Sequence, residues 1–150
     1  MKQYKENIKV FTDGSHTPSS CKYGIHFIDL EINDVSSNFK IKPLTNQRAE
    51  LYAILKAIKI INKNYEFKIL EIYTDSMYSI NCVTKWITKW KKNNFKTSSG
   101  ENVLNLDIIL KIDKYLNKYN GKIKFIHVKA HTGNNDFNSI HNDIADKLTR

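Results

Sequence analysis

Three acidic residues stand where a fold could bring carboxylates together. Asp13 closes the mainly apolar run NIKVFTD and precedes Gly14, and Asp75 closes the run FKILEIYT. Glu50 falls in the first turns of a helix that the sequence predicts after Thr45. Side chains at the carboxyl ends of strands project into the crevice where α/β sheets bind ligands. Taken singly, each aspartate also has the ordinary explanation of capping a turn.

Gathered in one crevice, such carboxylates would need a cation. Ionised carboxylates repel one another and lose hydration there unless a divalent ion neutralises them. Hard oxygen ligands suit Mg²⁺ or Mn²⁺ rather than Zn²⁺. In a chain with an excess of basic residues, the three together favour a metal site over three separate turn caps.

Length and composition place the chain among globular proteins. The 150 residues, 41% hydrophobic and 26% charged, predict one domain over residues 1–150 and exclude a collagen-like or wholly disordered chain. The sequence has no apolar run long enough for a membrane span, and its N-terminus lacks a secretory apolar segment. Cys21 and Cys82 do not have the spacing of a disulfide framework or a zinc site. We therefore expect a cytoplasmic protein, inside a host cell if it is viral, without a membrane partner.

The net charge of +9 favours polyanionic partners, nucleic acid first and an acidic membrane second. Genome composition is a competing source of this charge. The chain has 22 Lys, 20 Ile and 17 Asn, residue types with A/T-rich codons, and only 2 Arg. The positions of the lysines therefore have to distinguish the two explanations.

The hydrophobic periodicity predicts the elements that must position the carboxylates. An antiparallel meander of three strands comes first, followed by helices that alternate with strands, in the order βββαβααβα. This order predicts an α/β fold with a mixed five-stranded sheet flanked by helices. The expected strands are 7–13, 22–31, 35–42, 67–74 and 122–129, and the expected helices are 46–63, 76–92 with a break near 83–84, 103–119 and 140–148.

Five segments carry a resemblance to a known family. FTDGS, TNQRAEL, IYTDSMYSI, TKWITKWKKNNFKT and HVKAHTG occur in this order. In these segments the sequence resembles the type 1 ribonucleases H, which cleave RNA paired to DNA, from about residue 8 to residue 150. The resemblance implies a ribonuclease H-like fold, a single ribonuclease H domain, and an RNA/DNA hybrid as partner. We expect the protein to act as a monomer.

The resemblance also implies four metal-binding carboxylates, Asp13, Glu50, Asp75 and one on the C-terminal helix. The family pattern GN-x-x-AD-x-LA reads HNDIADKLT here, which matches Asp146 to the family aspartate and leaves Asp143 as the competing candidate. Two Mg²⁺ ions, for which Mn²⁺ could substitute, would activate a water and stabilise the leaving 3′-oxygen. Asp13 is expected to bridge them. The implied products have 5′-phosphate and 3′-hydroxyl ends.

A loop histidine is the fifth residue implied in catalysis. His131 follows the last predicted strand and matches the family's histidine loop, where it would transfer a proton or help product and metal to leave. A zinc pair of His127 and His131 is the alternative, but the sequence offers no third ligand for it.

Further residues are implied in reading the two strands of the hybrid. Asn46 and Gln47, near the implied metals, would detect the RNA 2′-hydroxyl. Capping of their own helix is the alternative role of these two residues. Trp86 would pack against a DNA sugar, and Thr45 and Asn105 match a DNA-phosphate pocket in which Pro43 stands where the family often has arginine. The complete set of implied contacts is Gly14, Ser15, His16, Thr45, Asn46, Gln47, Ser76, Met77, Tyr78, Trp86, Ser98 and Asn105.

The segment 85–96 carries five lysines and three aromatic residues. An amphipathic helix with solvated lysines would explain it, because Trp86 and Trp90 lie four residues apart. The density of positive charge also suits a surface that follows phosphates. The segment resembles the basic protrusion of free-standing family members, and we keep the name basic protrusion for residues 85–96. Its predicted phosphate contacts are Lys89, Lys91, Lys92 and Lys96.

Three other functions compete with this interpretation. An integrase-like or junction-resolving enzyme of the same superfold would use similar carboxylates on DNA. A hybrid-binding module without catalysis would keep the basic surface alone. A haloacid-dehalogenase-like phosphatase needs a second aspartate two positions after Asp13, where this chain has Ser15.

Overall fold

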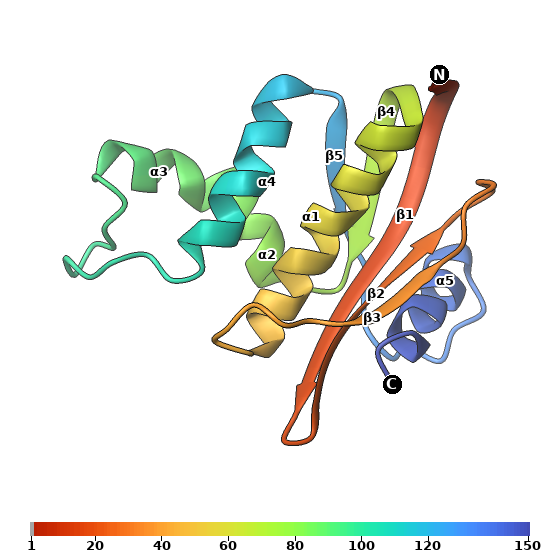
Figure 1. Cartoon of the computed structure of the whole chain (residues 1–150), viewed down its shortest axis with the longest axis horizontal. Coiled ribbons are helices and arrows are strands. Elements are labelled where there is room, and N and C mark those ends of the chain that lie inside the picture. Colours follow the sequence, from red (N-terminus) through yellow and green to blue (C-terminus); the bar gives the residue numbers. More distant parts are fainter. Residues whose placement is uncertain (1) are drawn as a thin grey trace.

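The structure, a computed structural model, describes residues 2–150 and contains the mixed five-stranded sheet that the sequence predicts (Figure 1). The strand order is β3-β2-β1-β4-β5, with β1, β2 and β3 antiparallel and with β4 and β5 parallel to β1. The strands are β1 (Gln3–Thr17), β2 (Ser20–Phe27), β3 (Val35–Asn38), β4 (Tyr65–Thr74) and β5 (Ile123–His127).

Helices connect the parallel strands and end the chain. They are α1 (Asn46–Asn64), α2 (Met77–Asn81), the π-helical segment η1 (Cys82–Trp86), α3 (Ile87–Lys92), α4 (Leu106–Lys118) and α5 (Phe137–Lys147). The break expected near Val83–Thr84 is a π-helical turn within a continuous helical segment. There the Thr84 hydroxyl donates to the carbonyl of Ile80 at 2.6 Å, a bond that bends helices.

Several predicted boundaries were wrong where distant residues set them. β1 begins at Gln3 rather than residue 7, because its first residues pair with Tyr65–Phe67. β2 ends at Phe27 and β3 at Asn38, each four residues before the predicted ends at 31 and 42. α4 begins only after Asn105, whose left-handed backbone (φ 64°) stops the helix from starting at 103.

The two faces of the sheet pack against different helices. On β1, Ile8 and Val10 belong to the main core beneath α1 and α4, whereas Phe11 belongs to a smaller cluster that includes Ala145 of α5. This alternation follows from the two-residue period of a strand. Gly24 of β2 brings α5 close, because a Cβ there would lie 2.6 Å from the Cβ of Leu148.

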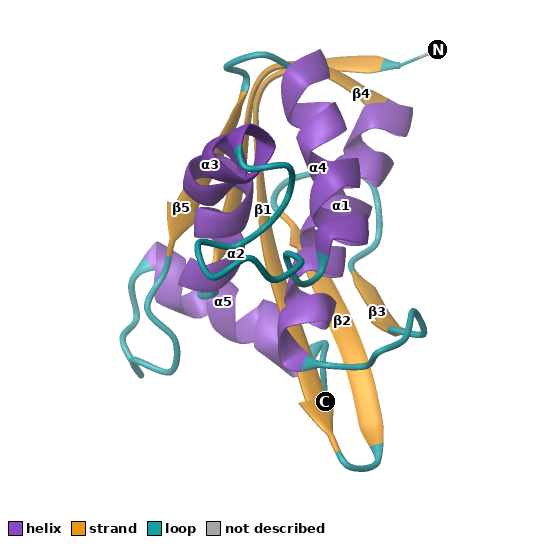
Figure 2. Cartoon of the chain, turned by 90° about the vertical axis from the view of Figure 1, so that its left-hand side faces the viewer, coloured by secondary structure: helices purple, strands orange, loops and turns teal. Residues whose placement is uncertain are grey.

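The helices therefore form a layer on each face of the sheet. α1 and α4 lie side by side on one face (Figure 1), and α5 packs against β1 and β2 on the other. α3 and the loop that follows it project from the body, and Figure 2, viewed from that side, shows them in front of the sheet. Among residues 2–150, no helix has the length and apolar character needed to cross a bilayer.

Candidate active site

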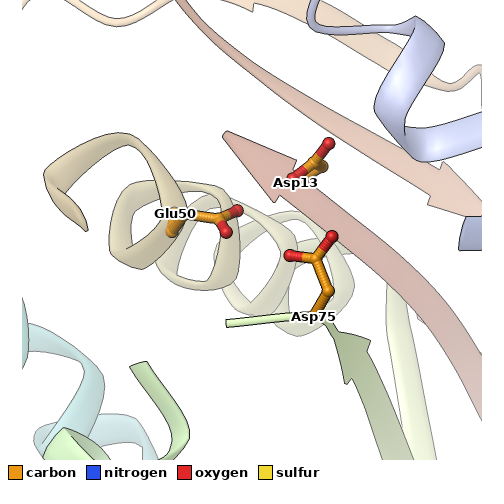
Figure 3. Close-up of side chains that lie close together, drawn as sticks. All are labelled: Asp13, Glu50 and Asp75. Atoms are coloured by element: carbon orange, nitrogen blue, oxygen red, sulfur yellow. The ribbon is translucent and has the colours of Figure 1, made fainter. Parts of the chain in front are cut away.

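Three carboxylates converge at one edge of the sheet (Figure 3). Asp13 lies near the end of β1, Asp75 directly follows β4, and Glu50 belongs to α1. One carboxylate oxygen from each lies within 4.8 Å of the others. Because β1 and β4 are parallel neighbours, their carboxyl ends meet at this edge. The grouping expected from the sequence is thus present in the structure.

Close packing of α1 against β1 brings Glu50 to the two aspartates. A Cβ on Gly14 would lie 2.5 Å from backbone atoms of Ala49 and Glu50, so only glycine permits this approach. Thr45 caps the helix by accepting a hydrogen bond from the Arg48 N–H at 3.1 Å. The first turn of α1 is therefore fixed beside the strand that carries Asp13.

Burial and mutual repulsion disfavour the charged forms of this cluster. Burial, followed by the charge of Asp75, raises the pKa of Asp13 to about 7. Burial also raises the pKa of Glu50 well above its ordinary value, and the charges of Asp13 and Asp75 add to the shift. The Oε1 atom of Glu50 is buried and lacks a hydrogen-bond partner. A divalent cation with oxygen ligands fits this arrangement, because it would satisfy that oxygen and relieve the repulsion.

A fourth carboxylate, Asp146 of α5, acts on this cluster from outside the group of three. Its charge contributes to the raised pKa of Asp13, after burial and the charge of Asp75. Asp146 also accepts a hydrogen bond from the guanidinium of Arg150, one helical turn later, at 2.7 Å. The choice of Asp146 over Asp143 as the fourth carboxylate stays a prediction.

Comparison with known proteins agrees with this geometry, since the RNase H family model matches residues 5–150. The chain belongs to the RNase H family. It is 35% identical over 151 residues to a ribonuclease H of Ehrlichia ruminantium, covering 100% of this chain and 97% of that protein. It is 42% identical over 127 residues to a probable ribonuclease H of Acanthamoeba polyphaga mimivirus, covering 83% of this chain and 55% of that protein. The protein is an RNase H enzyme.

Solved structures show the same fold. The solution structure of the PFV RNase H domain superimposes with a TM-score of 0.70 at 23% identity, covering 97% of this chain and 92% of that one. A foamy viral protease-reverse transcriptase in complex with an RNA/DNA hybrid gives a TM-score of 0.72 at 21% identity, covering 97% of this chain and 19% of that one.

His131 is not part of the group of close carboxylates in the described chain. His131 is exposed in the turn that follows β5, with a left-handed backbone (φ 52°). Within residues 2–150, no hydrogen bond or ion pair links it to Asp13, Glu50 or Asp75. Its role in proton transfer stays a prediction.

The residues implied in RNA recognition lie close to Asp13, Glu50 and Asp75 in the sequence. Asn46 and Gln47 are exposed in the first turn of α1, and His16 and Met77 are also exposed. Two serines bond within the protein. Ser15 Oγ donates to the Thr149 carbonyl at 3.2 Å, and Ser76 accepts from the Ser79 N–H as the cap of α2.

A hollow of about 340 Å³ on the basic protrusion lies between its helical segment and the loop that follows α3. It is lined by Trp86, Lys89, Trp90, Asn93, Lys96, Thr97 and Ser98. Tyr78 packs edge-to-face on Trp86 with ring centres 5.9 Å apart, and the Asn105 amide donates to the Tyr78 hydroxyl at 2.9 Å. Trp86, Tyr78 and Asn105 are thus joined in one network.

The four lysines predicted to contact phosphates differ in their partners. Lys91 forms an ion pair with Asp113 of α4 at 2.7 Å, and Lys96 donates to the side-chain oxygen of Asn102. Lys89 and Lys92 are exposed and, in the described chain, form no ion pair. Their positive charges are therefore free to meet a polyanion.

Sequence reasoning missed Arg48, which joins the catalytic helix to the implied phosphate pocket. Its guanidinium is buried and donates to both carboxylate oxygens of Asp107, at 2.8 and 2.7 Å. It also donates to the Asn105 side chain at 3.5 Å. Its place within TNQRAEL, beside the buried stripe of α1, was the available signal. Because a buried cation needs partners, that position could have predicted the partners' chemistry but not which residues they are.

Proposed function

We propose that this enzyme hydrolyses the RNA strand of RNA/DNA hybrids as an endonuclease, leaving 5′-phosphate and 3′-hydroxyl ends. The observation that carries the proposal is the convergence of Asp13, Glu50 and Asp75 in a family member whose relatives are named ribonuclease H. The net charge of +9 supports a nucleic-acid substrate. The proposal takes residues 1–150 as one domain that acts as a monomer in the cytoplasm.

Two Mg²⁺ ions are the cofactor that we propose, held by Asp13, Glu50, Asp75 and Asp146. When bound, such ions supply a water activated at neutral pH and neutralise charge that develops on the phosphate. Asp13 would be the central member of this set, since the charges of Asp75 and Asp146 both act on it. The buried, unpartnered Oε1 of Glu50 supports its role as a ligand.

The surrounding side chains would orient the hybrid and distinguish its strands. Asn46 and Gln47 are exposed beside Glu50, where an amide can donate to or accept from a 2′-hydroxyl. Trp86 presents an aromatic face that would pack closely on a sugar without a 2′-oxygen. Lys89 and Lys92, which have no carboxylate partner, would bind phosphates farther along the duplex.

Cleavage assays on three labelled duplexes test the proposal. Hybrid, duplex DNA and duplex RNA are incubated with the protein, with and without Mg²⁺. We expect cleavage of the RNA strand of the hybrid only, and only with the metal. Cleavage of duplex DNA but not of the hybrid would instead indicate an integrase-like or resolvase-like enzyme. Metal-independent binding without cleavage would indicate a hybrid-binding module.

A further inference from the structure

A second basic surface lies between α1 and α4, apart from both the carboxylates and the basic protrusion. A hollow of about 390 Å³, here called the α1–α4 groove, is lined by Lys59, Asn62, Lys111, Lys114, Tyr115 and Lys118. The four lysines are exposed, and Tyr115 is half-buried between them. Positive charge and an aromatic side chain thus share one concave surface.

The positive charge of the α1–α4 groove has no compensating carboxylate on its own helices. α1 and α4 contain three acidic residues, and each is engaged elsewhere. Glu50 belongs to the carboxylate cluster, Asp107 bonds to Arg48, and Asp113 pairs with Lys91. Among the described residues, the groove's four lysines form no ion pair, although Lys118 donates to the side-chain oxygen of Asn62 at 2.8 Å. No carboxylate neutralises their charge, which is available to a ligand.

A second hollow extends this surface around the end of α4. It has a volume of about 310 Å³ and shares Lys118 with the α1–α4 groove. It adds Lys2, Lys122 and the exposed ring of Tyr4, and contains one carboxylate, Glu66. The two hollows together form a track that suits an extended polyanion rather than a single small ion.

The spacing along α4 also suits a chain of phosphates. Lys111, Lys114 and Lys118 follow one face of the helix at intervals of about 4.5 and 6 Å along its axis. Tyr115 and Tyr4 offer rings on which bases could stack. A positively charged groove with aromatic side chains is the arrangement by which proteins bind single-stranded nucleic acid.

This track lies at the opposite end of the molecule from the carboxylates. Tyr4 and Asp13 are on the same strand, nine residues apart, which corresponds to about 30 Å. Figure 1 places the N-terminus and the C-terminal ends of α1 and α4 at one end of the molecule. A ligand in the track would therefore not touch the carboxylate cluster.

We propose that the α1–α4 groove and its extension bind single-stranded nucleic acid through its phosphates. This inference does not depend on the proposed cleavage reaction, because binding at the groove needs neither metal nor the carboxylates. An unpaired segment that flanks a duplex is a suitable ligand. An acidic polypeptide is the alternative occupant, and the experiment below separates the two.

Binding of a fluorescent single-stranded oligothymidylate of about 20 nucleotides, measured without metal, tests the inference. The groove variant replaces Lys59, Lys111, Lys114 and Lys118 with Gln. We expect about tenfold weaker binding at moderate salt, and a slope of log affinity against log salt reduced by up to about 2.8, at about 0.7 per lost contact. The control replaces four lysines outside the track with Gln and should change binding far less; these are Lys5, Lys40, Lys68 and Lys124.

Chemical-shift mapping of wild-type amides keeps the test independent of the variants. Oligothymidylate should shift residues 59–62 and 111–118, and oligoglutamate of equal charge should fail to displace it. Shifts confined to residues 85–96, equal losses in both variants, or displacement by oligoglutamate would overturn the inference. If the groove variant loses single-strand binding but still cleaves a blunt hybrid, the two proposals stand separately. If no hybrid is cleaved while single-strand binding follows the pattern above, only the proposed function fails.

Discussion

The carboxylate cluster and the basic protrusion place their charges by opposite means. The cluster gathers Asp13, Glu50 and Asp75 from elements far apart in the chain, with Asp13 buried and the other two half-buried. The protrusion presents Lys89 and Lys92 from one continuous helical segment, exposed to solvent. Chemistry at a phosphate needs fixed, desolvated ligands, whereas binding along a backbone needs accessible charge.

This difference separates the consequences of mutation. Removing a charge from the cluster should relieve repulsion in the metal-free protein and abolish the reaction. Removing a charge from the protrusion should leave the reaction intact and weaken binding in a salt-dependent way. The comparison predicts that no single substitution in one region reproduces the effects of the other.

Of the two aspartates of α5, only Asp146 is expected to have a large effect on cleavage. Asp146→Asn should reduce cleavage by more than about a hundredfold, because it removes the carboxylate proposed as the fourth metal ligand. Asp143→Asn, a matched change on the same helix, should retain cleavage. Steady-state rates on a labelled hybrid measure both. The reverse pattern would assign the fourth ligand to Asp143.

The pH dependence of stability tests the burial of the cluster. Because the pKa of Asp13 rises to about 7 on folding, its contribution to stability in metal-free protein is retained at pH 4 and lost as the pH rises through about 7. Asp13→Asn should therefore stabilise metal-free protein at pH 8 by about 2–4 kcal/mol and have little effect near pH 4. Urea melts in chelator measure this. Equal stability of the two proteins at pH 8 would contradict the raised pKa.

Two matched pairs of lysines test how the basic protrusion contributes to hybrid binding. Lys89→Ala with Lys92→Ala should weaken hybrid binding several-fold at moderate salt and reduce the salt slope by up to about 1.8. Lys91→Ala with Lys96→Ala removes the same charge but should cost less, because these lysines already bond to Asp113 and Asn102. Binding of non-cleavable hybrid across a salt series compares the pairs. Equal losses would mean that the ion pair does not hold Lys91 away from phosphate. If both double variants kept the wild-type hybrid affinity and salt slope, the lysines of the protrusion would be a solvated helix face without a role in binding.

The smallest effect is expected at Trp86. Trp86→Ala removes a ring that would pack on a DNA sugar, so the ratio of duplex RNA affinity to hybrid affinity should rise a few-fold. Trp86→Phe keeps an aromatic face against Tyr78 and serves as the control. An unchanged ratio in Trp86→Ala would remove this residue from strand discrimination.

Local signals in the sequence were sufficient for the sheet and for three site residues. The apolar runs that end at Asp13 and Asp75 predicted two strands of a mixed sheet, and the cap at Thr45 predicted the helix of Glu50. These signals depend on neighbours in the chain. The length of β1 could not be predicted, because its first residues extend the strand only by pairing with β4.

Bonds between side chains that are distant in the chain could not be predicted from the sequence either. Arg48 and Asp107 are 59 positions apart, and nothing local indicates that they bond. The pairing of Lys91 with Asp113 likewise depends on how the protrusion packs against α4. The ion pair of Asp146 with Arg150 is different, because its four-residue spacing on a helix could have been read directly.

Cleavage and binding of a labelled hybrid by the Asp13→Asn protein, in saturating Mg²⁺, test the central claim most directly. Asp13 belongs to the group of close carboxylates, and the residues that follow it in β1 include no other carboxylate that could replace it. The account predicts that cleavage is lost while hybrid affinity stays close to that of the wild-type protein. Retention of more than about a few per cent of the wild-type rate would contradict the two-metal assignment.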